Sequence, residues 1–187
     1  MKRLAIFVSG GGTNLQRIAD YFSTNPNVEI CLVVSNNADA YALQRAKNLS
    51  IPSEVIDRPT FKSAEFVARL KNLNIDLIVL AGFLWLVPQT LINAFPNKII
   101  NIHPALLPKY GGKGFYGEHV HKAVIAAHEK ESGITIHYAN EKYDSGDIIL
   151  QAKVDIDKND TPDTLAAKIH KLEYKHYPEV IEKLLNQ

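Results

Sequence analysis

Asn101 and His103 are the residues whose types and spacing most directly suggest chemistry. They alternate with apolar residues in the run Ile99-Ile100-Asn101-Ile102-His103, and Pro104 follows. This alternation predicts a strand that ends at Pro104, so both side chains leave the same face at its carboxyl end. An amide and an imidazole placed there could form a reaction centre, because open α/β sheets bind ligands at that edge. Alone, the pair could equally cap a turn, since chemistry needs a wider set of groups.

A glycine turn near the start of the chain is a candidate anion site. An apolar strand pattern, Leu4 to Val8, runs into Ser9-Gly10-Gly11-Gly12-Thr13-Asn14, and a helical pattern follows from Leu15 to Phe22. This layout aims free backbone N–H groups at an anion, and Thr13 and Asn14 could cap the helix. Leu15 occupies the third glycine position of a dinucleotide fingerprint and no Walker lysine follows, which favours a phosphomonoester over NAD or ATP. A tight turn without a ligand is the alternative.

Strand and helix patterns alternate along the first half of the chain. Strands are expected over 28–35, 52–56 and 74–82, with a helix over 38–48 and another that Thr60 could cap. This order predicts a mostly parallel, twisted sheet with helices on both faces. Strand patterns over 132–138 and 148–154 are close enough for a hairpin, so the C-terminal portion is expected to be antiparallel. A final helix starts near Pro162 and is expected to kink or break at Tyr177-Pro178.

The composition indicates a globular protein. The 187 residues, 46% hydrophobic and 22% charged, suit a single domain with a sizeable core. The formal net charge of +1 argues against a nucleic-acid partner, and the single Cys31 lies in an apolar run that predicts a buried thiol. No segment suggests a signal peptide or a membrane span, so we expect a cytoplasmic protein without a membrane partner.

Four further features have a structural and a functional interpretation. The segment Phe83–Pro88 could line a pocket for a flat heteroaromatic ligand or simply pack in the core. The glycine-rich loop 111–117 should be mobile until a ligand orders it, and His119 and His121 after it lack the partners of a zinc site, so we expect them to cap or orient the loop. His170 and Glu173 are spaced as neighbours on a helix, which usually means a solvated surface. Asp144 matters only if its turn folds against Asn101 and His103.

Five motifs together resemble the folate-dependent formyltransferases, and the likeness extends along essentially the whole chain. The motifs are Ser9-Gly-Gly-Gly-Thr-Asn-Leu15, Leu80-Ala-Gly-Phe83, Asn101-Ile-His-Pro-Ala-Leu-Leu-Pro-Lys-Tyr110, Gly133-Ile-Thr-Ile-His137 and Tyr143-Asp-Ser-Gly146. The resemblance implies a Rossmann-like formyltransferase domain over 1–187, with a phosphate-binding half over 1–100 and a catalytic and folate-binding half over 101–187. It also implies a monomer or homodimer that uses 10-formyltetrahydrofolate and no metal. The glycine turn and the final helix are most similar to members that formylate the glycyl amine of glycinamide ribonucleotide in purine biosynthesis.

The resemblance also implies roles for individual residues. Asn101 and the imidazolium of His103 would hold a tetrahedral oxyanion, while Asp144 would raise the pKa of His103 and help relay a proton. The ribonucleotide would contact Gly12, Thr13, Asn14, His170 and Glu173. The folate would contact Leu84, Trp85, Leu86, Val87, Asn101, Asn140, Glu141, Tyr143 and Asp144, and the supporting residues would be Thr135 and His137.

Some positions depart from the family pattern. Trp85 stands where many relatives carry an arginine, Ala64 replaces another folate-contacting arginine for which Lys62 could substitute, and the loop from Gly111 to Gly117 is extended.

Alternative functions are formyl transfer to methionyl-tRNA or to a sugar amine, or hydrolysis of the formyl folate; a tRNA enzyme or the hydrolase would normally carry an additional domain. A non-catalytic Rossmann-type nucleotide-binding module would have no need for Asn101, His103 and Asp144 together.

Overall fold

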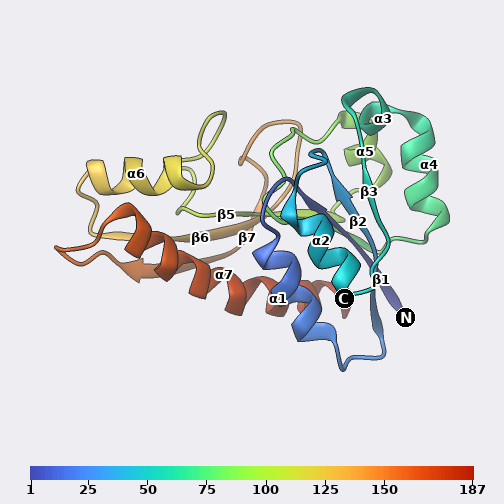
Figure 1. Ribbon diagram of the computed structural model, residues 1–187. Helices are drawn as coiled ribbons and strands as arrows, with labels where there is room; N and C mark the ends of the chain where they lie inside the picture. The colour runs from blue at the N-terminus through green and yellow to red at the C-terminus, as the bar shows by residue number, and fades with distance from the viewer.

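The apolar runs expected as strands pair into one seven-stranded sheet in the computed structural model, which describes residues 1–187 (Figure 1). The strands are β1 (Lys2–Val8), β2 (Val28–Ser35), β3 (Ser53–Val55), β4 (Leu77–Leu80), β5 (Ile99–His103), β6 (Glu131–Tyr138) and β7 (Ile148–Asp155). Their order is β3-β2-β1-β4-β5-β6-β7. Strands β1 to β5 pair in parallel with one another, whereas β6 pairs antiparallel with both β5 and β7, as the sequence predicts for the C-terminal portion.

The direction in which strands are added reverses beside β1. The chain builds outward from β1 to β3 and then returns to the other side of β1 for β4 and β5. The carboxyl ends of β1 and β4 therefore form the crevice where open α/β sheets bind ligands. β4 is shorter at both ends than the expected strand over 74–82, and Asn74 and Gly82 at these ends adopt left-handed conformations with φ of 52° and 73°.

Helices cover both faces of the sheet, as predicted (Figure 1). They are α1 (Thr13–Phe22), α2 (Tyr41–Asn48), α3 (Arg58–Lys62), α4 (Ala64–Asn72), α5 (Gln89–Ala94), α6 (Glu118–Ala126) and α7 (Pro162–Leu185). Side chains of α1, α2, α6 and α7 share one hydrophobic core with the sheet, and those of α3, α4 and α5 share the other. None of these helices has the length and apolar character needed to cross a bilayer.

The expected break in the final helix is wrong, because α7 continues through Pro178 to Leu185. The preceding residue, Tyr177, is fully buried, and its hydroxyl donates to the carbonyl oxygens of Leu80 at 2.9 Å and Ile100 at 3.3 Å. Proline removes one backbone hydrogen bond, but packing against the sheet holds the helix on both sides of it.

The expected helix caps at Thr60, Thr13 and Asn14 are also wrong. Asp57 caps α3 by accepting from the Thr60 N–H at 2.9 Å, and Ser63 caps α4, so two short helices replace the single expected one. No side chain caps α1, where Gly12 occupies the N-cap position with φ of 70°. The first N–H groups of α1 are consequently left available for a ligand.

Candidate active site

The carboxyl ends of β1, β4 and β5 open into a cavity of about 620 Å³. Its wall is formed by the glycine turn 10–14, the segment 81–85, the end of β5 at 101–104, the loop 112–117 and single residues from other elements: Arg58, His121, Tyr143, Asp144, His170 and Glu173. The volume lies within the range of small-molecule sites, roughly 300–1,000 Å³. The cavity is therefore large enough for a substrate, and it lies at the expected edge of the sheet.

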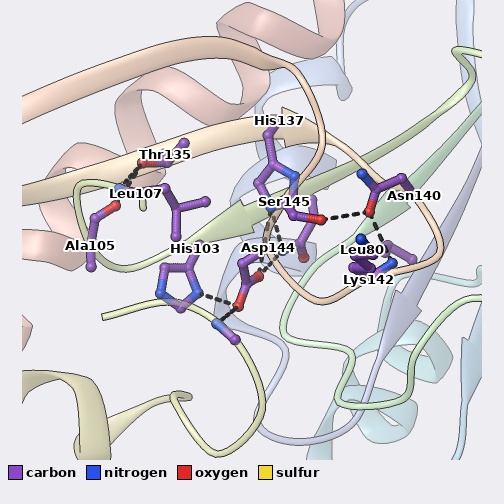
Figure 2. Close-up of polar contacts among 12 residues, drawn as sticks. Leu80, His103, Ala105, Leu107, Thr135, His137, Asn140, Lys142, Asp144 and Ser145 are labelled. Atoms are coloured by element: carbon purple, nitrogen blue, oxygen red, sulfur yellow. Dashed lines mark hydrogen bonds and ion pairs between the residues drawn. The ribbon is translucent and has the colours of Figure 1, made fainter. Parts of the chain in front are cut away.

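Asn101, His103 and Asp144 meet at this cavity. Asn101 and His103 share one face of β5, and the turn after β6 folds back so that Asp144 lies within reach of both. Figure 2 shows Asp144 beside His103. His103 Nδ1 lies 3.5 Å from Asp144 Oδ2, and Asn101 Nδ2 lies 3.4 Å from Asp144 Oδ1. The turn that carries Asp144 therefore folds against Asn101 and His103, which is the condition under which Asp144 could take part in chemistry.

Asp144 is a buried carboxylate with several donors around it. Burial acts to raise the pKa of this carboxyl, but neighbouring polar groups, among them His103 and the Gly112 N–H, hold the pKa below its usual value. The Gly112 N–H donates to Oδ2 at 2.9 Å. Asp144 is therefore ionised at neutral pH, with its negative charge next to the imidazole of His103.

Asp144 acts to raise the pKa of His103, as expected, but the net shift of this pKa is downward. His103 is 4% exposed, and burial lowers its pKa more than Asp144 and the Tyr110 carbonyl raise it. Nε2 lies 2.7 Å from the carbonyl oxygen of Tyr110, so Nε2 carries a hydrogen. In the neutral ring Nδ1 is then unprotonated and lies on the side of Asp144. His103 in this state can act as a general base, not as a general acid.

Thr135 and His137 support the end of β5 from the neighbouring strand β6. In the pairing of β5 with β6, His137 lies opposite Asn101 and Thr135 opposite His103. Thr135 Oγ1 donates to the carbonyl oxygen of Ala105 at 2.7 Å and accepts from the Leu107 N–H at 3.0 Å (Figure 2). These bonds fix the chain where it leaves β5, directly after His103.

Glu173 and Asn14 meet at the glycine turn, although they are far apart in sequence. Asn14 Nδ2 donates to Glu173 Oε2 at 3.1 Å, and His170 Nδ1 lies 3.0 Å from the same oxygen. Glu173 is only 6% exposed, so its interpretation as a solvated helix surface is wrong. The bond to Glu173 raises the pKa of His170 although burial opposes it. Asn14 Oδ1 is buried without a partner, which leaves an acceptor for a donor on a bound ligand.

An aromatic wall lines the cavity near β4. Phe83, Leu84 and Trp85 contribute to it, and the Arg58 guanidinium stacks over the Trp85 ring at 4.6 Å. Sequence reasoning missed Arg58, because nothing in the spacing along the chain connects the start of α3 to the segment after β4. Other residues expected at the folate do not line this cavity: Leu86 is exposed and Val87 is in the core. Asn140, Glu141, Lys62 and Ala64 do not line it either.

Neither histidine after the glycine-rich loop caps the helix that follows, but the His119 ring packs edge-on against Tyr116 of the loop. α6 begins at Glu118, so His119 and His121 lie in its first turn, and no side chain caps this helix. His121 is 4% exposed and lines the cavity, and its Nδ1 has no hydrogen-bond partner. Burial lowers the pKa of His121. Its position facing the cavity could not be read from the sequence, because it depends on how α6 docks.

Comparison with known proteins identifies the relatives of this chain. The sequence profile of the formyl transferase family matches residues 2–181. The chain is 42% identical to the chloroplastic phosphoribosylglycinamide formyltransferase of Arabidopsis thaliana over 96% of its own length, and spans 64% of that protein. It is 42% identical to the enzyme of the same name from Haemophilus influenzae, with 97% of this chain and 86% of that protein aligned. The crystal structure of phosphoribosylglycinamide formyltransferase from Bacillus halodurans superimposes with a TM-score of 0.87 at 39% identity, covering 100% of this chain and 96% of that one.

Proposed function

Because this chain belongs to the formyl transferase family, we propose that it transfers the formyl group of 10-formyltetrahydrofolate to the glycyl amine of glycinamide ribonucleotide. The relatives carry the name of that activity. The observation that carries the proposal is the meeting of Asn101, His103 and Asp144 at the rim of one cavity with the uncapped glycine turn. A non-catalytic nucleotide-binding module would need the glycine turn alone.

The two ends of the cavity suit the two substrates. The free N–H groups after Gly12 suit a phosphate, and the buried carboxylate of Glu173 beside Asn14 suits ribose hydroxyls. The aromatic wall with Trp85 suits a flat pterin ring, and the cationic Arg58 stacked on it suits an acidic tail. The residues of this chain thus fit a folate as co-substrate beside a ribonucleotide.

The reaction would proceed by direct attack. The amine nitrogen attacks the formyl carbon, and the carbonyl oxygen becomes an oxyanion that the Asn101 amide stabilises. His103 Nδ1, with Asp144 beside it, takes the proton that the amine loses and delivers it to N10 of the folate as the bond from N10 to the formyl carbon breaks. No proton is gained or lost overall. The imidazolium formed in passing is stabilised by the ionised Asp144 at 3.5 Å.

Mass-spectrometric detection of the formylated ribonucleotide tests this function directly. The chain is incubated with 10-formyltetrahydrofolate and glycinamide ribonucleotide, and parallel reactions offer initiator methionyl-tRNA or an amino sugar as acceptor. We expect formylation of the ribonucleotide alone, at a rate proportional to enzyme concentration. A folded protein that formylates one of the other acceptors instead, or none, would reject the proposal.

A further inference from the structure

The main chain of residues 110–112 contacts both members of the His103–Asp144 pair. His103 Nε2 lies 2.7 Å from the carbonyl oxygen of Tyr110, and the Gly112 N–H donates to Asp144 Oδ2 at 2.9 Å. One short segment therefore accepts from the imidazole and donates to the carboxylate. Its position decides how the two groups face each other.

The conformation of Tyr110 requires external support. Its φ is 56°, in the left-handed region that residues other than glycine avoid unless their surroundings impose it. The hydroxyl of Tyr110 donates to Glu129 Oε1 at 2.9 Å, and its ring packs edge-on against Phe115. Glu129 lies between α6 and β6, so this bond joins the beginning and the end of the segment that connects β5 to β6.

Close packing fixes the same segment against Asp144. A Cβ at Gly111 would meet the Leu107 side chain and would lie 3.3 Å from the Cβ of Asp144. The backbone at Gly111 thus leaves no room for a side chain beside Asp144, and the Gly112 N–H is bonded to its carboxylate, so a shift of Tyr110 would be transmitted to Asp144 as well as to His103.

We propose that Tyr110 is a positioning residue: tethered by its hydroxyl to Glu129, it holds its carbonyl on His103 Nε2 and thereby directs Nδ1 toward Asp144. The inference deepens the proposed formyl transfer and rests on it for its catalytic consequence. The geometric consequence, the fixed orientation of the His103 ring, is independent of the reaction.

The tether has a chemical effect on His103. With Nε2–H held by a carbonyl, proton exchange is confined to Nδ1, where Asp144 lies. The carbonyl also favours the protonated ring, because it is an acceptor for an N–H that becomes more positive. Loss of the tether should therefore lower both the pKa of His103 and the rate of proton transfer.

Four substitutions distinguish the effect of the hydrogen bond between Tyr110 and Glu129, the tether, from other effects of changing these side chains. Tyr110→Phe and Glu129→Ala remove the bond between Tyr110 and Glu129. Glu129→Gln keeps an acceptor oxygen for the Tyr110 hydroxyl. Lys109→Met removes the other partner of Glu129, an exposed lysine 2.9 Å from the same oxygen, and serves as the matched control.

We expect Tyr110→Phe and Glu129→Ala to lower kcat about five-fold, the effect of losing roughly one hydrogen bond, and to leave KM for the ribonucleotide within about two-fold. Glu129→Gln and Lys109→Met should retain kcat within about two-fold. Unchanged kcat in the first two variants, or an equal loss in Lys109→Met, would overturn the proposal.

A titration of histidine signals by NMR, without substrates, provides a readout that does not depend on turnover. The His103 signal is assigned by its absence in His103→Asn. Its pKa should fall in Tyr110→Phe and Glu129→Ala and stay unchanged in the other two variants; an unchanged pKa in all four would reject the tether. The other titratable groups that act on His103, which are Asp144, His137 and Glu173, are the same in every variant. Absence of formyl transfer by the unmodified chain would reject the proposed function alone.

Discussion

The side-chain nitrogen of Asn101 lies 3.1 Å from Nε2 of His137, its cross-strand neighbour on β6. His137 Nδ1 lies 2.8 Å from the carbonyl oxygen of Tyr138, so in the neutral ring Nδ1 carries the hydrogen and Nε2 accepts from Asn101. The second N–H of Asn101 contacts Asp144 at the longer distance of 3.4 Å. His137 thus fixes the amide, and the more weakly held N–H is the one that an oxyanion would take.

Asn101→Ala should therefore remove oxyanion stabilisation without disturbing binding. We expect kcat to fall about 100- to 1,000-fold, corresponding to the roughly 2.7–4 kcal/mol that one such donor contributes. KM for the ribonucleotide should change by no more than about two-fold, because the hydrogen bonds of the Asn101 side chain go to His137 and Asp144 and not to the glycine turn. Steady-state formyl transfer measures both constants, and a raised KM with an unchanged kcat would contradict the assigned role.

Gly12→Ala should damage the glycine turn, whereas Gly10→Ala should not. Gly12 has φ of 70°, and a Cβ there would lie 2.6 Å from the Cβ of Ala42 and 2.8 Å from its Cα, while a Cβ on Gly10 would meet nothing within 4 Å. We expect Gly12→Ala to lower the free energy of unfolding by about 1–3 kcal/mol and to raise KM for the ribonucleotide. Urea denaturation and kinetics of the two variants test this; equal effects would show that the turn tolerates a side chain at Gly12.

Trp85→Ala should weaken the folate end of the cavity, because it removes the ring on which Arg58 stacks. We expect KM for 10-formyltetrahydrofolate to rise about five- to thirty-fold, as for the loss of roughly 1–2 kcal/mol of aromatic contact, with KM for the ribonucleotide unchanged. Leu86→Ala is the matched control, since Leu86 is exposed and does not line the cavity. A comparable rise of KM for 10-formyltetrahydrofolate in Leu86→Ala would contradict this assignment, because it would show that Leu86 contacts the folate as well.

Stability should decrease as pH falls below about 6.5, the pKa of histidine in an unfolded chain. Burial lowers the pKa of His103 and His121 in the folded protein, so the unfolded chain binds protons first and gains stability as the pH falls through this range. His170 acts in the opposite sense, because Glu173 raises its pKa. Acidification is thus destabilising through His103 and His121 and stabilising through His170 alone. The Tm of the protein should therefore be lower at pH 5.5 than at pH 7.5.

His121→Gln tests which groups cause this pH dependence, since it removes one of the two buried imidazoles and keeps a polar side chain of similar size. The difference in Tm between pH 7.5 and pH 5.5 should be smaller in this variant than in the unmodified chain. Differential scanning calorimetry at both pH values measures it, and a difference as large as before would mean that His121 does not titrate with folding.

Much of the fold was predictable, because each strand and helix is encoded by a local pattern. The runs that form β1 and β2 are apolar enough to be buried in a parallel sheet, and alternation in β5 and β6 gave the faces of Asn101, His103, Thr135 and His137. Helix ends were predicted less well. Thr60 resembles a cap, but the side chain that accepts the hydrogen bond is that of Asp57, and the difference depends on the local path of the backbone.

The sequence by itself determined the secondary structure, the family and the residue types available for chemistry, since these follow from periodicity and motifs along the chain. Only the tertiary structure decided which of those residues meet. Asn14 contacts Glu173 across 159 positions, Arg58 stacks on Trp85, and the turn after β6 brings Asp144 to His103. It also decided that burial outweighs Asp144 in setting the pKa of His103. Such outcomes depend on distance and on the exclusion of water, which arise only when segments remote in sequence pack together.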